Sequence, residues 1–323
     1  MLASSFVFAM ETEVLQAERS YAPHIALFAV QVFFGSATVL GKFALLAFPP
    51  YALVGFRVGG AALAFYFLQR LRGTLALDNR GDYLKFAIFA LIGVALNQLF
   101  FFKGLSLTTA VNTSLIAVTI PIFTIIISVL IGIDSISWRK VAGITLAAAG
   151  VVYLVNPTRA SFGSETTQGD ILIVLNSLCY AIYMAISKKL ISHYGALKSI
   201  AWLFIYASLI NVPVGIYALK DVDLGQVSLN SWLFVAGLVV FPTIMAYFWN
   251  AWALSRVEPS IVAVYIYLQP LIGFLAAIFF LGEVFSTRLL ISALLVFAGV
   301  FLVTKKRRKG EEEKRRQETN LQP

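Results

Sequence analysis

The chain of 323 residues is too apolar for a soluble globular protein. Hydrophobic residues make up 59% of it, charged residues make up only 13%, and the mean hydropathy is +0.85, which leaves too little polar surface to cover a globule in water. The net charge of +9 does not indicate nucleic-acid binding, because many basic residues lie together in Lys305–Arg316, directly after the last apolar run. The composition therefore predicts an integral membrane protein surrounded by the lipid bilayer.

Apolar runs of about the 20 residues needed to cross a bilayer core recur along nearly the whole chain. We predict ten transmembrane helices, in chain order Pro23–Phe48, Pro50–Arg70, Asp82–Gly104, Leu107–Gly132, Ser137–Val155, Gly169–Leu190, Ala196–Lys220, Asn230–Ala253, Pro259–Leu281 and Thr287–Lys305. Short loops join these runs, so no soluble catalytic domain lies between them. The predicted fold class is an all-α integral membrane protein.

The segments outside these helices are short. Residues 1–21 are predicted to form a cytoplasmic N-terminal extension, because they lack the basic start and the long apolar run of a signal peptide. The longest connector, Asn156–Asp170, is rich in Pro, Gly, Ser and Thr and marks a linker at the middle of the chain. Residues 305–323 are predicted to form a basic cytoplasmic tail, which sets the topology or, as the less favoured alternative, binds anionic lipid.

Basic residues concentrate in loops that are two apart along the chain. These residues are Arg70, Arg72, Arg80 and Lys85, then Arg139 and Lys140, then Lys188, Lys189 and Lys198, and finally Arg256. Because cytoplasmic loops of membrane proteins carry the excess of Lys and Arg, this pattern places both termini in the cytoplasm, and we predict the plasma (inner) membrane as the location. An even number of crossings is then required, which ten helices satisfy.

The second half of the chain repeats the first. When Pro121 is aligned with Pro270, an offset of 149 residues, the same ungapped offset pairs further residues. Among these pairs are Ser106 with Ser255, Arg139 with Arg288, Gly150 with Gly299, and Asp134 with Glu283. Chance can match leucines and valines, but it does not readily pair Pro, Arg, Gly and acid at one offset, so we predict an internal duplication.

The duplication predicts an inverted architecture. Its parts are a first five-helix repeat at 22–155, a linker at 156–168 and a second five-helix repeat at 169–304. Because five is an odd number, the second copy enters the membrane from the opposite side. Two inverted repeats are typical of secondary transporters, which use them to open a central site to either side in turn.

The residues of the second half also resemble a known family. The run "PTIMAYFWNAWALSRVEPSIVAVYIYLQPLIGFLAAIFFLGE", followed by "FAGVFLV", is similar to the second repeat of EamA-type transporters of the drug/metabolite transporter superfamily. The first repeat departs from the pattern: "IGID" stands where the family often has Leu-Gly-Glu, and Phe34-Gly35 stands in place of Trp-Gly. The resemblance spans about Ala22 to Val303 and implies ten helices and small-molecule transport, often export, without implying one substrate.

Polar side chains that share one face of an apolar helix are expected to point into a cavity or a helix interface, because exposure to lipid is costly. Such faces hold Gln31, Thr38 and Lys42; Asn176, Tyr180 and Tyr183; Thr243, Tyr247 and Asn250; and Tyr265 and Gln269, with Asn97 and Asn112 as weaker candidates. We interpret these residues as the substrate pathway. The alternative, interhelical hydrogen bonds that hold the bundle together, stays open. Tyr267 lies about 200° around the helix from Tyr265 and is expected elsewhere.

Two prolines and the absence of central acids bear on mechanism. Pro121 and Pro270 each remove a backbone hydrogen bond in equivalent helices, and we interpret them as paired gating hinges, with static kinks as the alternative. No carboxylate falls at a midplane position, since Asp134 and Glu283 lie at helix ends. The sequence therefore gives no sign of coupling to protons through a buried acid.

The pattern as a whole predicts a secondary transporter that moves a small organic metabolite, an amino acid or a related compound, by alternating access. The alternatives are a carrier of an anionic metabolite such as a sugar phosphate, which would suit Lys42, Arg57 and Lys103, and a non-transport receptor or scaffold. Arg57 lies only about two turns from Pro50, so we expect it to extend toward the outer surface. No enzyme, metal or cofactor is predicted, because clustered acids, histidines and nucleophile–base pairs are missing. The substrate, the coupling ion and the oligomeric state stay undetermined.

Overall fold

The structure, a computed structural model, consists of helices joined by turns and loops in the residues that it describes. These are residues 21–155, 158, 163, 166–272, 275 and 287–304, without the side chains at positions 38, 39, 42, 110, 111 and 155. The predicted N-terminal extension up to residue 20, the basic tail, most of the linker and the end of the ninth predicted helix lie outside the described residues.

The helices follow one another with short connections. Their bounds are α2 (Ala22–Leu45), α3 (Pro50–Arg72), α4 (Arg80–Ala90), η1 (Leu91–Leu96), α5 (Asn97–Leu107), α6 (Ala110–Ala117), α7 (Thr119–Leu130), α8 (Trp138–Val155), α9 (Thr167–Tyr194), α10 (Ala196–Ala218), η3 (Leu224–Gln226), α11 (Leu229–Val239), η4 (Val240–Met245), α12 (Ala246–Leu254), α13 (Pro259–Val264), η5 (Tyr265–Tyr267) and α15 (Thr287–Thr304). Here η1 and η4 are π-helical turns, and η3 and η5 are 3-10 turns.

Seven of the described helical segments are long and apolar enough to cross a membrane. Two further apolar helices, Ala22–Ala37 and Pro259–Ile272, are shorter. The described residues thus form helices and their connections, as expected of a membrane protein, whereas the count of ten crossings stays a prediction.

Local sequence accounts for where several helices begin. Pro50 and Pro259 occupy the first position of α3 and α13, where a missing N–H costs nothing. The side chains of Asn79, Thr109 and Ser228 each accept a hydrogen bond from a backbone N–H in the first turn of α4, α6 and α11, respectively. These caps satisfy N–H groups that have no partner within the helix.

Two kinds of helix interruption recur 149 residues apart. The π-helical turn η1 covers Leu91–Leu96, and η4 covers Val240–Met245. In the other pair, the helix is broken at Val118 between α6 and α7, and η5 tightens the chain at Tyr265–Tyr267. Pro121 and Pro270 follow these two breaks closely, and Pro121 lies in the first turn of α7, where no backbone donor is needed. Segments that the predicted duplication would pair thus deviate from regular α-helix at the same positions.

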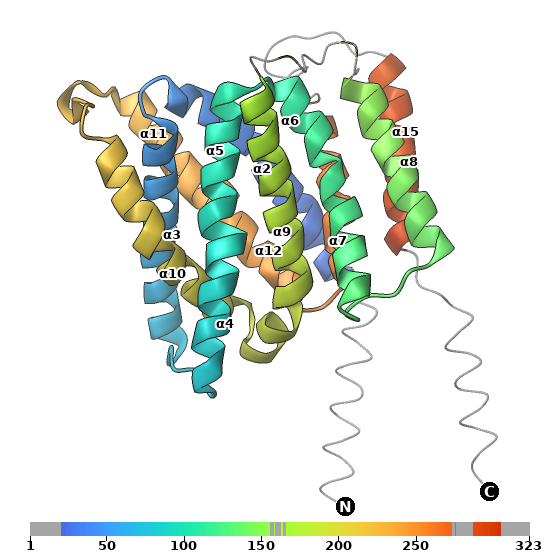
Figure 1. Cartoon of the computed structure of the whole chain (residues 1–323), viewed down its shortest axis with the longest axis horizontal. Coiled ribbons are helices and arrows are strands. Elements are labelled where there is room, and N and C mark those ends of the chain that lie inside the picture. Colours follow the sequence, from blue (N-terminus) through green and yellow to red (C-terminus); the bar gives the residue numbers. More distant parts are fainter. Residues whose placement is uncertain are drawn as a thin grey trace, which may run out of the picture.

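The helices pack in pairs that join the two halves of the chain. α3 packs against α10 at one edge of the bundle, and α8 packs against α15 at the opposite edge (Figure 1). Between these pairs, α2 contacts α11 and α12, while α9 contacts η1 and α5. The core of the molecule is therefore an interface between the first and the second half.

Small residues permit the two edge pairs to approach closely. A Cβ atom added to Gly55 would lie 2.9 Å from the Cα atom of Gly215, and one added to Gly143 would lie 2.7 Å from the carbonyl oxygen of Gly299. Side chains at these positions would separate the helices, so glycine is required for the contact.

Polar and apolar side chains are distributed as lipid surroundings require. Large apolar side chains such as Leu63, Phe67 and Leu294 are more than half exposed on the outside of the bundle. Gln31 and Asn112, in contrast, are buried inside it. This arrangement suits hydrocarbon outside and a polar interior.

Candidate functional site

Two hydrogen bonds connect α2 with the segment that begins at η5. The Gln269 side-chain nitrogen donates to the Gln31 side-chain oxygen over 2.8 Å, and His24 Nδ1 lies 2.8 Å from the Tyr265 hydroxyl. His24 was not among the residues predicted from the sequence to take part in the polar pathway. Because His24 and Tyr265 are 241 residues apart, periodicity within either helix could not reveal the contact.

A second set of contacts connects α5 and α12 with α9. Asn97 and Asn176 each donate a side-chain N–H to the backbone oxygen of the other, over 3.1 and 2.9 Å. The Asn250 side chain donates to the Tyr180 hydroxyl over 3.1 Å. All four side chains are buried, so these are interior contacts: the Asn97–Asn176 pair joins the two halves, and the Asn250–Tyr180 pair lies within the second half.

The third set surrounds Arg57 of α3. Its Nε donates to the Thr243 hydroxyl over 2.8 Å, and one terminal nitrogen donates to the Gln98 side-chain oxygen over 3.1 Å. The Gln98 side-chain nitrogen donates in turn to the Tyr247 hydroxyl over 2.7 Å. Arg57 is only 3% exposed, so the expected extension toward the outer surface is wrong: the side chain finds hydrogen-bond acceptors in the interior instead.

Of the remaining predicted residues, Tyr183 adjoins the second set, with its ring centroid 6.2 Å from that of Tyr180, whereas Asn112 lies elsewhere. Tyr183 is buried with its ring against Gly93 of η1, where any side chain would collide with it. Asn112 donates to the carboxylate of Asp170 in the first turn of α9, which also accepts from Thr108. The structure thus places Asn112 near an end of the bundle.

The side chains of Thr38 and Lys42 lie outside the described residues. Tyr267 points to a neighbouring helix, where its hydroxyl donates to the Val118 backbone oxygen over 2.9 Å. Gln98 is not among the residues predicted from the sequence, although it lies 149 residues before Tyr247, which is.

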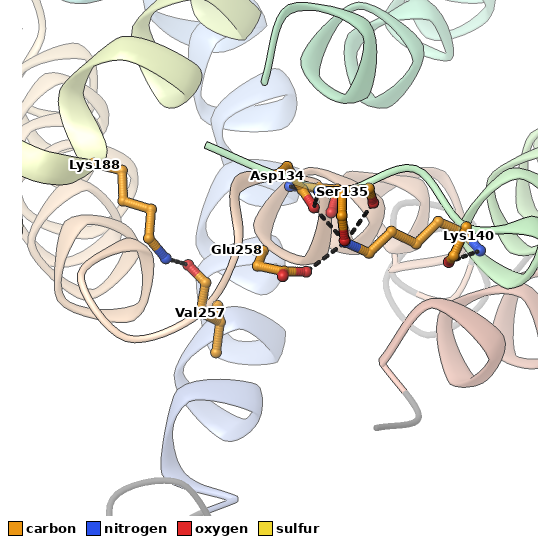
Figure 2. Close-up of polar contacts among 8 residues, drawn as sticks. Asp134, Ser135, Lys140, Lys188, Val257 and Glu258 are labelled. Carbon is orange, nitrogen blue, oxygen red and sulfur yellow. Dashed lines mark hydrogen bonds and ion pairs between the residues drawn. The ribbon is translucent and has the colours of Figure 1, made fainter. Parts of the chain in front are cut away.

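A cluster of charges joins the loops that precede α8 and α13. Figure 2 shows the Lys140 ammonium between the carboxylates of Asp134 and Glu258, with hydrogen bonds to both. The backbone N–H of Ser260 also donates to Asp134. Lys188 of α9 lies to one side and donates to the Val257 backbone oxygen, so α8 and α13, with the loops that precede them, meet α9 at this end of the bundle (Figure 2).

The charges of this cluster differ in exposure. The Asp134 side chain is fully buried and that of Lys140 is 9% exposed, whereas that of Glu258 is 42% exposed. Burial by itself would raise the pKa of the Asp134 carboxyl, but hydrogen bonds from Lys140 and Ser260 and the charge of Lys140 lower that pKa below its ordinary value. Asp134 is therefore ionised at neutral pH.

No group of three or more His, Cys, Asp and Glu side chains suited to a metal ion occurs in the described part of the chain. The chemistry offered by the three interior sets consists of amide, hydroxyl and guanidinium hydrogen bonding, with aromatic rings alongside. Such groups bind and orient an organic solute.

Comparison with known proteins identifies the family. The profile of the EamA-like transporter family matches residues 22–156 and 167–305. The chain belongs to this family. The resemblance seen in the sequence is thereby confirmed, and the chain is a membrane transporter of the drug/metabolite transporter superfamily.

Relatives from three groups of organisms agree with this assignment. An uncharacterized transporter of Archaeoglobus fulgidus is 28% identical over 88% of this chain and 97% of its own length. The transporter YyaM of Bacillus subtilis is 24% identical over 86% and 92% of the two chains. A WAT1-related protein of Arabidopsis thaliana is 24% identical over 87% and 84%. The family and the names of these relatives indicate a transporter rather than an enzyme.

A solved structure shares the fold. This crystal structure of a protein superposes with a TM-score of 0.74 at 19% sequence identity, covering 88% of this chain and 99% of the other. The EamA-like transporter described here therefore has a fold that has been observed experimentally.

Proposed function

We propose that this EamA-like transporter is a secondary carrier for a small organic solute, an amino acid or a related compound, which it exports from the cytoplasm by alternating access. The observation that carries the proposal is the buried polar network between the two halves of the chain. Side chains from α2, α3, α5, α9 and α12 converge there on partners from the other half. A polar interior of this kind is costly in a membrane bundle and is typical of a solute pathway.

The pairing of residues supports an inverted repeat in this proposal. Gln98 bonds to Tyr247, and Tyr267 bonds to Val118, and the members of each pair are 149 residues apart. When two copies are related by a two-fold axis, a residue meets its own counterpart only close to that axis. The axis of the proposed five-helix repeats, 22–155 and 169–304, then runs through the polar network.

Contacts at the edge of the bundle support the same axis. A Cβ atom added to Gly143 would contact the Gly299 oxygen, and one added to Gly150 would contact the Ser292 oxygen. The offset of 149 residues relates Gly143 to Ser292 and Gly150 to Gly299, so it converts the first pair of contacts into the second. Reciprocal contacts of this kind are expected from two-fold symmetry.

Alternating access assigns a role to the cluster of Asp134, Lys140 and Glu258. Asp134 and Lys140 belong to the proposed first repeat and Glu258 to the second, so their contacts hold one end of the bundle together. We infer that this end faces the cytoplasm, where the basic loops place both termini. The cluster must separate when the solute passes this end, and Pro121 and Pro270 are the proposed hinges.

Flux into proteoliposomes tests the proposal. Purified protein would be reconstituted and assayed with labelled amino acids, comparing the wild type with Gln269→Ala and Tyr265→Phe. Saturable flux is expected in the wild type, and Gln269→Ala is expected to reduce it about tenfold because Gln31 loses its partner. Gln226→Ala, in an exposed turn, is the matched control and leaves flux unchanged. If no compound moves faster than through empty vesicles, the proposal fails.

A further inference from the structure

Arg57 carries a buried positive charge whose described partners are all neutral. They are the Thr243 hydroxyl, the Gln98 side-chain oxygen, the Pro242 backbone oxygen at 3.4 Å and the ring of Phe102, whose centroid is 4.9 Å from the guanidinium carbon. Hydrogen bonds to neutral groups orient a guanidinium, but they do not balance its charge.

The described carboxylates that contact other groups have partners other than Arg57. Asp82 pairs with Lys85, and Asp134 and Glu258 pair with Lys140. Asp170 accepts from Thr108 and Asn112. Within the described part of the chain, no carboxylate forms an ion pair with Arg57, so the protein supplies no anion to it there.

The guanidinium also keeps unused donors. Each of its two terminal nitrogens carries two N–H groups, and one described hydrogen bond is formed by each nitrogen. Because the guanidinium is planar, two such N–H groups match the two oxygens of a carboxylate or phosphate, which a lysine ammonium does not. The residue therefore has both the charge and the geometry to bind an oxyanion.

The position of Arg57 connects this capacity with the solute pathway. Its partner Gln98 bonds to Tyr247, and these two residues form one of the two pairs that lie close to the proposed axis. Thr243 and Pro242 belong to η4, the π-helical turn of the second half, so Arg57 bridges the two halves. π-helical turns are frequent at functional sites.

We propose that Arg57 binds an oxyanion, the carboxylate or the phosphate of the transported solute, next to the axis between the two halves. The inference rests on the proposed function and narrows it to solutes that carry such a group. Since Arg57 is almost fully covered here, binding requires that Gln98 release it, which the opening of the bundle brings about. The solute then supplies the negative charge that the described residues do not.

The first experiment compares matched solutes on the wild-type carrier. Labelled amino acids are assayed against their carboxamides, and glucose 6-phosphate against glucose, so that the two arms separate a carboxylate from a phosphate. The wild type is expected to prefer the oxyanion form by about 10- to 100-fold in kcat/KM, the range of a charge-assisted hydrogen bond. Equal flux of both members of every transported pair would overturn the inference and leave the carrier function standing.

The second experiment uses variants. Arg57→Gln is expected to abolish the preference, Arg57→Lys to retain part of it, and the matched control Arg256→Gln, at an exposed loop cation, to leave it unchanged. Arg57→Gln with the preference intact would overturn the inference. If Arg57→Gln does not fold, Arg57→Lys and the solute pairs still decide.

A binding assay that needs no transport separates the oxyanion site from the carrier function. Thermal unfolding of detergent-solubilised protein is followed with inorganic phosphate, the amino acids or glucose 6-phosphate added. A probe that binds is expected to stabilise the wild type against thermal unfolding. Its affinity for Arg57→Gln is expected to be at least tenfold lower. If stabilisation occurs without any flux, the carrier function fails but the oxyanion site stands. If no probe stabilises the wild type, the oxyanion site is refuted.

Discussion

Replacing Lys140 by Met tests the charge cluster most directly, because it leaves the buried carboxylate of Asp134 without its cation. The Asp134 side chain is fully buried and that of Lys140 is 9% exposed, so the pair is largely removed from solvent. Removing one partner of such a pair costs about 3–5 kcal/mol of folding free energy. The Glu258 carboxylate is 42% exposed, and Glu258→Gln is expected to cost only about 0–1 kcal/mol.

Thermal unfolding of the purified protein, followed by tryptophan fluorescence, measures this difference. Lys140→Met is expected to unfold at a clearly lower temperature than Glu258→Gln. The double variant Asp134→Asn, Lys140→Met is expected to regain much of the loss, because no uncompensated charge stays buried. Equal losses for Lys140→Met and Glu258→Gln, or a further loss in the double variant, would refute the assignment of a buried pair.

Three further predictions follow from individual residues. Because the pKa of Asp134 is lowered, its stabilising contribution is present above its unfolded value of about 3.9 and is lost as the pH falls through its folded value. The difference in stability between wild type and Asp134→Asn is therefore expected to stay constant from pH 5 to 8 in thermal unfolding, and a change across that range would contradict it. Gly143→Ala is expected to cost about 1–3 kcal/mol, since its Cβ would lie 2.7 Å from the Gly299 oxygen, whereas Gly41→Ala, with its nearest contact at 3.6 Å, is neutral or stabilising in the same assay. Pro270→Ala is expected to slow flux more than it lowers the folded yield, and equal losses in both would favour a static kink over a hinge.

Much of the helical architecture was predictable from hydropathy. The predicted spans Pro50–Arg70 and Ala196–Lys220 lie close to the observed α3 and α10, because lipid-facing helices must be apolar over their whole length. The breaks near Pro121 and Pro270 were also predictable, since proline lacks the backbone donor. The π-helical turns were not predicted, because nothing in the composition of Leu91–Leu96 departs from an ordinary apolar helix.

The sequence by itself determined that this protein is helical, lies in a membrane, resembles a transporter family and carries polar residues on particular helix faces. Those properties depend on the chemistry and spacing of neighbouring residues. Only the tertiary structure decided which faces meet: it turned Arg57 inward to Gln98 and Thr243, and brought Glu258 to Lys140. The physical reason is that periodicity orients a side chain about its own helix axis, whereas its partner depends on how distant helices pack.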